Sequence, residues 1–329
     1  MRILMYDAKS YDKESFQKIV GNHEGIVMDY IDIELSMKTI GLAHGYDAIC
    51  VFVNCNLNRE IIEKLTEFDI HLVLLRFAGF NQVDMDAARE KNLTILRVPA
   101  YAPEAIAEHA MALALSVNRH IHKAYIKVRE NNFALLGLTG VNFHGKVAGV
   151  IGTGKIGACT CNICKGFSMK VIAYDPYPNR DLDFVTYVGL EELCKQSDVI
   201  FLHCPSTLEN YHLINRKTIE LMKDGVILVN TSRGLLVDTE DLIQGIRNKK
   251  FFGVGLDVYE EEGSNVFENR EDDILEHSTT SRLLSFPNVI ITSHQAFLTY
   301  EALEAIAQTT VQNALDYQNG TMKEEHLVK

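Results

Sequence analysis

A glycine-rich turn between two apolar runs constrains this chain more than any other feature. Residues 147–151 read Val-Ala-Gly-Val-Ile, and Gly152, Gly154 and Gly157 follow in the order Gly-x-Gly-x-x-Gly. A helix-like segment and a second apolar run then lead to Asp175. A strand, a glycine turn, a helix and an acid-ended strand in this order predict a dinucleotide-binding βαβ unit.

Each position of this motif has a physical role in such a unit. Gly152 permits the tight turn, and Gly154 lets the backbone approach a pyrophosphate without a Cβ in the way. Gly157 lets the helix pack close to the strand, so that its first amides point at the phosphates. Asp175 is expected to bind the ribose and to repel a 2′-phosphate, which favours NAD(H), although Arg180 keeps NADP(H) open. The turn residues expected to bind the cofactor are Gly152, Thr153, Gly154, Lys155, Ile156 and Gly157.

Composition limits the classes of partner. The chain has 329 residues, 47% of them hydrophobic and 23% charged, which predicts a globular protein with room for two domains. A net charge of -12 argues against nucleic acid and anionic membranes as partners. No run reaches the length of a membrane span, and the N-terminus resembles a first strand rather than a signal peptide.

The seven cysteines have no framework spacing, which predicts reduced thiols and a cytoplasmic protein. Cys159, Cys161 and Cys164 include one CxxC pair, which would also suit a redox couple or half of a zinc site. No second CxxC or paired histidine completes such a site. We therefore expect small residues on a buried helix face and no metal site.

Apolar runs alternate with amphipathic segments in two series, a rhythm that indicates parallel α/β sheets. In the first series the expected strands are 2–6, 47–53, 71–76 and 93–96, and the expected helices are 12–20, 58–68 and 83–91. In the second series the expected strands are 146–151, 170–174, 199–203, 226–230, 253–257 and 289–292. Long helical stretches are expected at 103–128 and 301–317.

The glycine turn lies in the middle of the chain, so the nucleotide-binding domain is predicted to be an insertion. We expect two doubly wound parallel-sheet domains, with an NAD-binding Rossmann domain inserted into a flavodoxin-like substrate domain. The expected boundaries are 1–100 and 299–329 for the substrate domain and 101–298 for the NAD-binding domain.

Candidate chemical groups follow the expected strands, where ligands of open α/β sheets bind. Arg233 follows the strand 226–230, the acidic run 260–262 follows 253–257, and His294 follows 289–292. Each has an ordinary interpretation as a surface ion pair, a charged loop or a solvated histidine. Together they are the groups that reduction of a 2-keto acid requires. An arginine fork binds a carboxylate, and a histidine kept cationic by a carboxylate donates a proton.

Over nearly its whole length the chain resembles the D-specific 2-hydroxyacid dehydrogenases. The resemblance lies in the glycine motif with Asp175, in Asn-Thr-Ser-Arg-Gly at 230–234, in Asp-Val-Tyr-Glu-Glu-Glu at 257–262 and in His-Gln-Ala-Phe at 294–297. It implies that His294 is the acid/base, that Arg233 binds the substrate carboxylate, and that Glu262 pairs with His294, with Glu260 as second choice. It further implies cofactor contacts from Cys204, Pro205, Thr231, Ser232 and Asp257, and substrate contacts from Ala78, Gly79, Tyr101 and Phe297.

Within the family, the long segment 265–275 and the Val-Pro-Ala-Tyr-Ala-Pro run at 98–103 resemble the D-lactate dehydrogenases. That branch implies reduction of pyruvate to D-lactate with NADH. Phe77 and Phe80 depart from its usual pattern around Gly79. The alternatives are an enzyme for bulkier branched or aromatic 2-keto acids, and a non-catalytic NAD(H)-sensing scaffold. The family also implies a homodimer or higher homo-oligomer, with the helix 103–128 near the interface.

Overall fold

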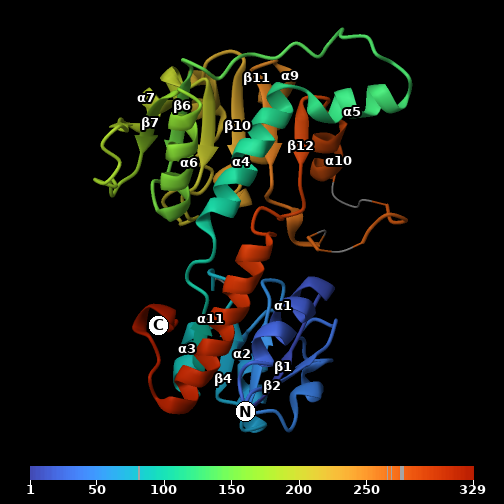
Figure 1. The fold of residues 1–329 in the computed structure, drawn as a ribbon, viewed down its shortest axis with the longest axis vertical. Coiled ribbons are helices and arrows are strands. Elements are labelled where there is room, and N and C mark those ends of the chain that lie inside the picture. The colour runs from blue at the N-terminus through green and yellow to red at the C-terminus, as the bar shows by residue number, and fades with distance from the viewer. Residues whose placement is uncertain (81, 265, 268, 275–277) are drawn as a thin grey trace. The chain divides into compact units, whose positions relative to one another are not determined.

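A parallel β-sheet organises each of the two units into which the chain divides (Figure 1). The computed structural model describes residues 1–80, 82–264, 266–267, 269–274 and 278–329. The first unit comprises Met1–Ala102 and Leu298–Lys329, and the second comprises Pro103–Phe297. Of the segment 265–275, residues 265, 268 and 275 lie outside the described residues.

The first unit contains a five-stranded sheet with the order β2-β1-β3-β4-β5. All neighbouring strands are parallel, and the order is that of a flavodoxin-like doubly wound sheet. β3 and β4 are buried along their whole length, as expected for parallel strands covered on both faces. The strands are β1 (Arg2–Met5), β2 (Val27–Tyr30), β3 (Ala48–Val51), β4 (Leu72–Leu75) and β5 (Thr94–Arg97).

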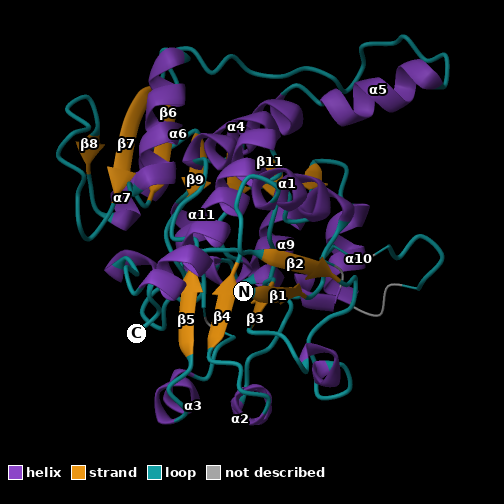
Figure 2. Cartoon of the chain, turned by 60° about the horizontal axis from the view of Figure 1, so that its bottom comes forward, coloured by secondary structure: helices purple, strands orange, loops and turns teal. Residues whose placement is uncertain are grey.

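In the described part of the first unit, four α-helices cover this sheet, and the last of them comes from the C-terminal end of the chain. They are α1 (Ser10–Val20), α2 (Arg59–Glu67), α3 (Met85–Glu90) and α11 (Tyr300–Asn319). α1 packs against α11, and α2 packs against α3, as Figure 2 also shows for the second pair. The helices α2, α3 and α11 begin at side-chain caps, which are Asn58, Asp84 and Thr299.

The second unit contains a seven-stranded parallel sheet with the order β12-β11-β10-β9-β6-β7-β8. The strand order reverses between β6 and β9, and this switch point is where doubly wound sheets bind ligands. The strands are β6 (Val147–Ile151), β7 (Lys170–Tyr174), β8 (Thr186–Tyr187), β9 (Val199–Leu202), β10 (Val226–Asn230), β11 (Phe251–Leu256) and β12 (Val289–Ile291). The two sheets confirm the predicted fold class.

Hydrophobic cores lie on both faces of this sheet. On one face lie α4 (Pro103–Asn118) and α6 (Lys155–Gly166), which Figure 1 shows in front of the strands. On the other lie α7 (Leu190–Gln196), α8 (Arg216–Leu221), α9 (Thr239–Arg247) and α10 (Ser278–Ser285). Cys161 and Cys164 are fully buried on α6, and burial raises the pKa of the Cys161 thiol to about 12. These two cysteines therefore pack as small apolar residues, as predicted, whereas the expectation of a buried position is wrong for Cys159, which is only half-buried.

The structure differs from the sequence-based expectation in three places. β2 and β8 are absent from the expected strands; both are short and lie at the edges of their sheets. The single helix predicted for 103–128 is wrong: α4 ends at Asn118 and α5 (Ile121–Arg129) begins after a break. The break occurs at His120, whose φ of 52° is left-handed and incompatible with a continuous α-helix. Among the described residues, no helix combines the length and apolarity needed to span a membrane.

Candidate active site

The glycine turn between β6 and α6 is built as the motif predicts. Gly152 has a φ of 91°, and a Cβ placed on it would lie 2.7 Å from the backbone nitrogen of Cys204. A Cβ on Gly157 would lie 1.9 Å from the carbonyl oxygen of Gly152. Both positions therefore exclude any larger residue, since the turn passes the end of β9 and the helix packs directly on the turn.

The start of α6 suits an anionic group. Gly154 caps this 12-residue helix without a side-chain hydrogen bond, and its first turn has no acidic residue. A Cβ on Gly154 would meet no atom within 4 Å, so the space beside this glycine is open. Unpaired amides and the helix dipole attract negative charge, and this cradle therefore fits the pyrophosphate of a dinucleotide. Lys155 and Ile156 form the first turn of the helix behind it.

Asp175 is fixed beside this turn at the end of β7. Its Oδ2 accepts hydrogen bonds from the backbone nitrogen of Thr153 at 2.6 Å and from the Thr153 hydroxyl at 2.9 Å. Its Oδ1 accepts one from the backbone nitrogen of Tyr177 at 2.8 Å. The Tyr187 hydroxyl donates to the Thr153 hydroxyl at 3.1 Å and so extends the network. A carboxylate has about four acceptor positions, which leaves capacity for a ribose hydroxyl.

The ends of β9 and β10 are joined across the sheet. The Ser232 hydroxyl donates to the carbonyl oxygen of Cys204 at 2.6 Å. Burial raises the pKa of the Cys204 thiol to about 11, so at neutral pH the thiol is protonated and does not act as a nucleophile. Pro205 follows it and is exposed. The Thr231 hydroxyl is buried without a hydrogen-bond partner among the described residues, which suits an additional polar ligand.

Arg233 extends from a turn that Asn230 holds in place. The Asn230 side chain donates to the carbonyl oxygen of Arg233 at 2.9 Å and accepts from the backbone nitrogen of Ser232 at 3.0 Å. The Arg233 side chain is exposed, and its Nη1 donates to the Ser232 carbonyl at 2.7 Å. Within the described residues it forms no ion pair with a carboxylate, so its guanidinium can bind an anionic ligand.

His294 and Glu262 face each other. The Nδ1 of His294 lies 3.3 Å from the Oε1 of Glu262, with the side chains 26% and 18% exposed. Glu260 instead binds His212, and Glu261 accepts a hydrogen bond from the Thr279 hydroxyl. Of the three consecutive glutamates, Glu262 is thus the one that contacts the histidine. The sequence motif favours the same glutamate but leaves Glu260 as an alternative.

Asp257 organises the loop that carries His294. Its carboxylate is 1% exposed and accepts from the Thr292 hydroxyl at 2.5 Å and from the backbone nitrogens of Gln295 and Ala296 at 2.9 Å. Burial alone would raise the pKa of Asp257, but hydrogen bonds from His109, Thr292 and Ala296 lower it below its ordinary value. These partners occupy the carboxylate, and the expected contact with the nicotinamide stays a prediction.

Sequence reasoning missed residues that touch this site. His109 on α4 lies 3.4 Å from the Asp257 carboxylate, and the ring of Phe267 lies 6.1 Å from that of His294. Phe267 also meets Phe297 edge to face at 6.2 Å, so Phe297 belongs to the same apolar cluster. Phe267 lies in the segment 265–275 that carries the family resemblance, and His109 lies in the helical stretch expected at 103–128, but no pattern in the sequence marks either side chain as part of the site. The left-handed φ of His294, 51°, was equally invisible in the sequence.

The remaining expected substrate residues belong to the first unit. Ala78 and Gly79 are half-buried in the loop after β4, and Tyr101 is half-buried in the segment after β5. Arg97 holds this loop, since its Nη1 donates to the Ala78 carbonyl at 2.8 Å and its guanidinium lies 5.2 Å from the centre of the Phe80 ring. Phe80 is therefore in contact with the arginine that supports the loop.

Known proteins resemble this chain along its length. The family model described as D-isomer specific 2-hydroxyacid dehydrogenase, NAD binding domain, matches residues 111–296. The chain is 46% identical to the D-lactate dehydrogenase of Escherichia coli (strain K12) over 330 residues, covering 100% of both. It is similar to the solved pyruvate reductase of Chlamydomonas reinhardtii, with a TM-score of 0.93 and 39% identity over 97% of each chain. A solved D-2-hydroxyisocaproate dehydrogenase gives a TM-score of 0.90 and 32% identity over 100% of this chain and 99% of its own.

Proposed function

This chain belongs to the D-isomer specific 2-hydroxyacid dehydrogenases, a family of NAD-dependent oxidoreductases, and we propose that it reduces pyruvate to D-lactate with NADH. The observation that carries the proposal is the contact between His294 and Glu262 at 3.3 Å. A partly buried histidine beside a carboxylate is the proton donor that reduction of a ketone requires. The similarity to a D-lactate dehydrogenase and to a pyruvate reductase supports pyruvate as the substrate.

In this mechanism the side chains bind the substrate and move one proton. The Arg233 guanidinium binds the substrate carboxylate through two parallel hydrogen bonds and so orients the keto group. NADH, when bound, supplies the hydride to the carbonyl carbon. His294 donates its proton to the carbonyl oxygen as charge develops there, and Glu262 stabilises the cationic imidazole beforehand. Phe267 lies beside this histidine and contacts Phe297, and the two rings provide apolar surface near the reacting group.

We assign the cofactor contacts to the turn and the strand ends of the second unit. The N-terminus of α6 would bind the pyrophosphate, and Asp175 the adenine-side ribose. Cys204, Pro205, Thr231 and Ser232 would border the nicotinamide end. The second unit is then the NAD-binding domain, and the first unit is the substrate domain with Ala78, Gly79 and Tyr101 as contacts.

The second candidate function is reduction of bulkier 2-keto acids by the same mechanism. The similarity to a D-2-hydroxyisocaproate dehydrogenase supports it. One methylene in an apolar pocket changes the binding free energy by only about 1–3 kcal/mol, so small differences in the lining residues can change which 2-keto acid is preferred.

Steady-state kinetics of NADH oxidation separate these candidates. We expect the highest kcat/KM with pyruvate, a lower value with 2-ketoisocaproate and phenylpyruvate, and D-lactate as the product. A higher kcat/KM with the bulky acids would favour the second candidate function. NADH binding without turnover of any keto acid would contradict both and favour a cofactor-sensing scaffold.

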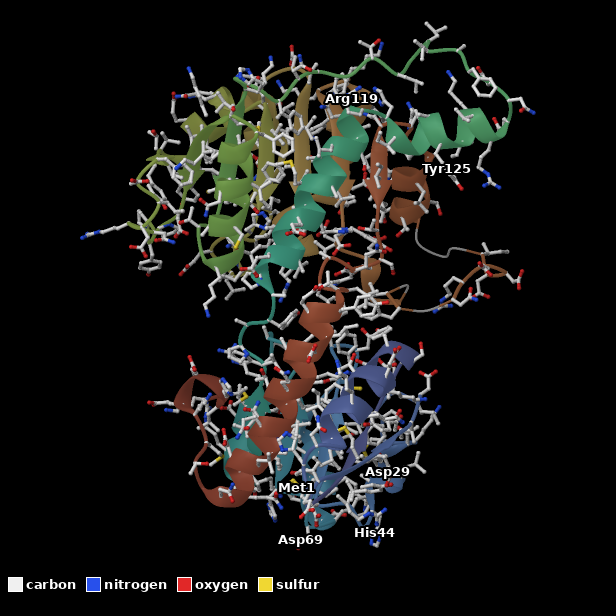
Figure 3. All side chains as sticks on the ribbon, viewed as in Figure 1. Met1, Asp29, His44, Asp69, Arg119 and Tyr125 are labelled. Atoms are coloured by element: carbon white, nitrogen blue, oxygen red, sulfur yellow. The ribbon has the colours of Figure 1, made fainter. Side chains whose placement is uncertain are left out.

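We further propose that the chain forms a homo-oligomer through α5 and the segment after it. α5 has no buried residue, and Tyr125 projects from it into solvent (Figure 3). Large apolar side chains remain exposed in this stretch: Ile121, Tyr125, Ile126, Val128, Phe133, Leu135 and Leu136. Monomeric proteins rarely expose such a concentration of apolar surface. Light scattering should give a multiple of the chain mass of 37.1 kDa, and Leu136→Asp combined with Tyr125→Asp should reduce it toward that of the monomer.

The cysteines support a reducing, cytoplasmic location. All seven are free thiols, and Cys50, Cys55 and Cys194 are buried in addition to the pair on α6. When cells are lysed in an alkylating buffer without reductant, mass spectrometry of the denatured protein should find all seven cysteines alkylated.

A further inference from the structure

His212 stands in the loop between β9 and α8 and contacts the two loops that carry the proposed catalytic groups. It has a left-handed φ of 51°, and its ring is stacked on that of Tyr211 with the centres 3.8 Å apart. The side chain is 23% exposed. None of the roles assigned above uses this residue.

The first of these contacts is to the loop of Arg233. The backbone nitrogen of His212 donates to the carbonyl oxygen of Leu235 at 3.0 Å. Its Nδ1 lies 3.1 Å from the Oδ2 of Asp238, the residue that caps α9. Leu235 and Asp238 follow Arg233 closely in the chain, so His212 restrains the segment that leads from Arg233 into α9.

The second contact is to the loop of Glu262. The Nε2 of His212 lies 2.6 Å from the Oε1 of Glu260, and the Oε2 of Glu260 accepts from the backbone nitrogen of Thr239 at 2.9 Å. Burial acts to raise the pKa of Glu260, but the hydrogen bonds from Thr239 and His212 lower it below its ordinary value. Glu260 is therefore an ionised anchor with both oxygens engaged, two residues before Glu262.

The two loops also touch directly. A Cβ on Gly234 would lie 2.3 Å from the carbonyl carbon and oxygen of Tyr259, so the backbones beside Arg233 and Glu260 are in close contact. A displacement of one loop is thus transmitted to the other. His212 sits where both loops can be held by one side chain.

We propose that His212 is a positioning residue. Through Glu260 and Asp238 it holds the loops of Arg233 and Glu262 in a fixed position relative to each other. The inference rests on the roles proposed for Arg233 and Glu262. It also gives Glu260 a function that differs from that of Glu262: Glu260 holds the loop, and Glu262 contacts His294.

The variant His212→Phe tests the proposal, because phenylalanine retains the stacked ring and removes both ring nitrogens. We expect kcat/KM for pyruvate to fall about 10- to 100-fold, since small misplacement of reacting groups is costly, while the Kd for NADH changes less than about twofold. The matched control is His71→Phe, which removes another histidine–carboxylate pair, 3.3 Å from Asp69 on the surface of the first unit. The control should keep wild-type kinetics.

Variants of Glu260 separate positioning from proton transfer. Glu260→Gln retains an acceptor for His212 and should lose less activity than Glu260→Ala. The double variant His212→Phe/Glu260→Ala should be no worse than the more damaged single variant, because both remove the same link. In Glu260→Ala the pH at which kcat/KM declines should remain that of the wild type. A displaced pH profile, or additive losses in the double variant, would overturn the proposal.

Hydrogen exchange supplies a readout that does not depend on turnover. In His212→Phe, the amides of residues 235–239 and 258–262 should exchange faster than in the wild type, while those of β6 and β7 should not change. Absence of turnover in the wild type would refute the proposed function, and exchange would still test the link between the loops. Unchanged exchange in either loop, or a His212→Phe enzyme with wild-type kcat/KM, would refute the positioning role.

Discussion

Arg76 and Arg233 both follow a parallel strand, yet their surroundings are opposite. Arg76 comes directly after β4 and is 1% exposed. Its guanidinium binds the Asp12 carboxylate at 3.1 Å and the carbonyl oxygens of Tyr6 and Asp7 at 3.2 and 2.6 Å, with the Phe52 ring centre at 4.3 Å. Arg233 follows β10, is exposed, and donates to the carbonyl of its own neighbour, Ser232.

The difference shows what turns a strand-end arginine into a ligand-binding group. The acceptors of Arg76 lie directly after β1 and on α1, at least 64 residues earlier in the chain. They bind its guanidinium inside the fold, so Arg76 is part of the core. No comparable acceptors from the described part of the second unit reach Arg233. The same contrast holds for the acids, since Asp12 is paired inside the fold while Glu262 keeps a buried oxygen, Oε2, without a partner among the described residues.

The largest effect, on the stability of the first unit, is expected from removing the buried ion pair between Arg76 and Asp12. Arg76→Leu would leave the Asp12 carboxylate buried without its cation and should destabilise the first unit by about 3–5 kcal/mol. Urea denaturation of the variant and the wild type measures this change in the free energy of unfolding. Arg233→Leu serves as the comparison, and its midpoint of urea denaturation should equal that of the wild type. A loss below about 1 kcal/mol for Arg76→Leu would mean that the pair is not structural.

The next effect concerns catalysis. Arg233→Gln removes two charge-assisted hydrogen bonds to the substrate carboxylate, and kcat/KM for pyruvate should fall about 100-fold or more, mainly through KM. Binding of NADH, followed by fluorescence titration, should remain near the wild-type value. Weakened NADH binding with an unchanged KM for pyruvate would assign Arg233 to the cofactor instead.

A smaller change is expected at the residue beside His294. Glu262→Gln replaces the carboxylate that lies 3.3 Å from the Nδ1 of His294 with a neutral amide. Proton donation to the carbonyl oxygen should become less favourable, so steady-state kinetics should show a fall in kcat/KM for pyruvate of about 30-fold, mainly through kcat. The comparison variant Glu260→Gln leaves this contact intact and should lose less activity. A wild-type kcat in Glu262→Gln would remove Glu262 from the role of His294 partner.

The smallest effect is expected on the preference for NADH over NADPH, at the adenine-side ribose of the cofactor. Asp175→Ala removes a charge that would repel a 2′-phosphate, and the ratio of kcat/KM for NADH to that for NADPH should fall about tenfold. The Thr153 hydroxyl would lose its acceptor, so some loss of NADH affinity should accompany the change. A ratio that stays constant would show that Arg180 or another neighbour sets the cofactor preference.

The glycine turn and the fold class could be predicted because they depend on local properties. Gly152 must adopt a positive φ, Gly157 must admit a carbonyl oxygen, and apolar runs separated by helices require a parallel sheet. The same local reasoning failed at 103–128, where the left-handed His120 ends the helical run. It also could not separate Glu260 from Glu262, since both lie in one acidic run.

Which residues follow the ends of the strands can be predicted from the chain alone, because side-chain type and strand periodicity depend on neighbouring residues. Which of these residues are bound within the protein, and which remain open to a ligand, depends on partners that only the folded chain brings near. His212 and Glu260 lie 48 residues apart, and Arg76 lies 64 residues from Asp12. Hydrogen bonds and charges act over a few ångströms in space, so their partners become known only when the chain has folded.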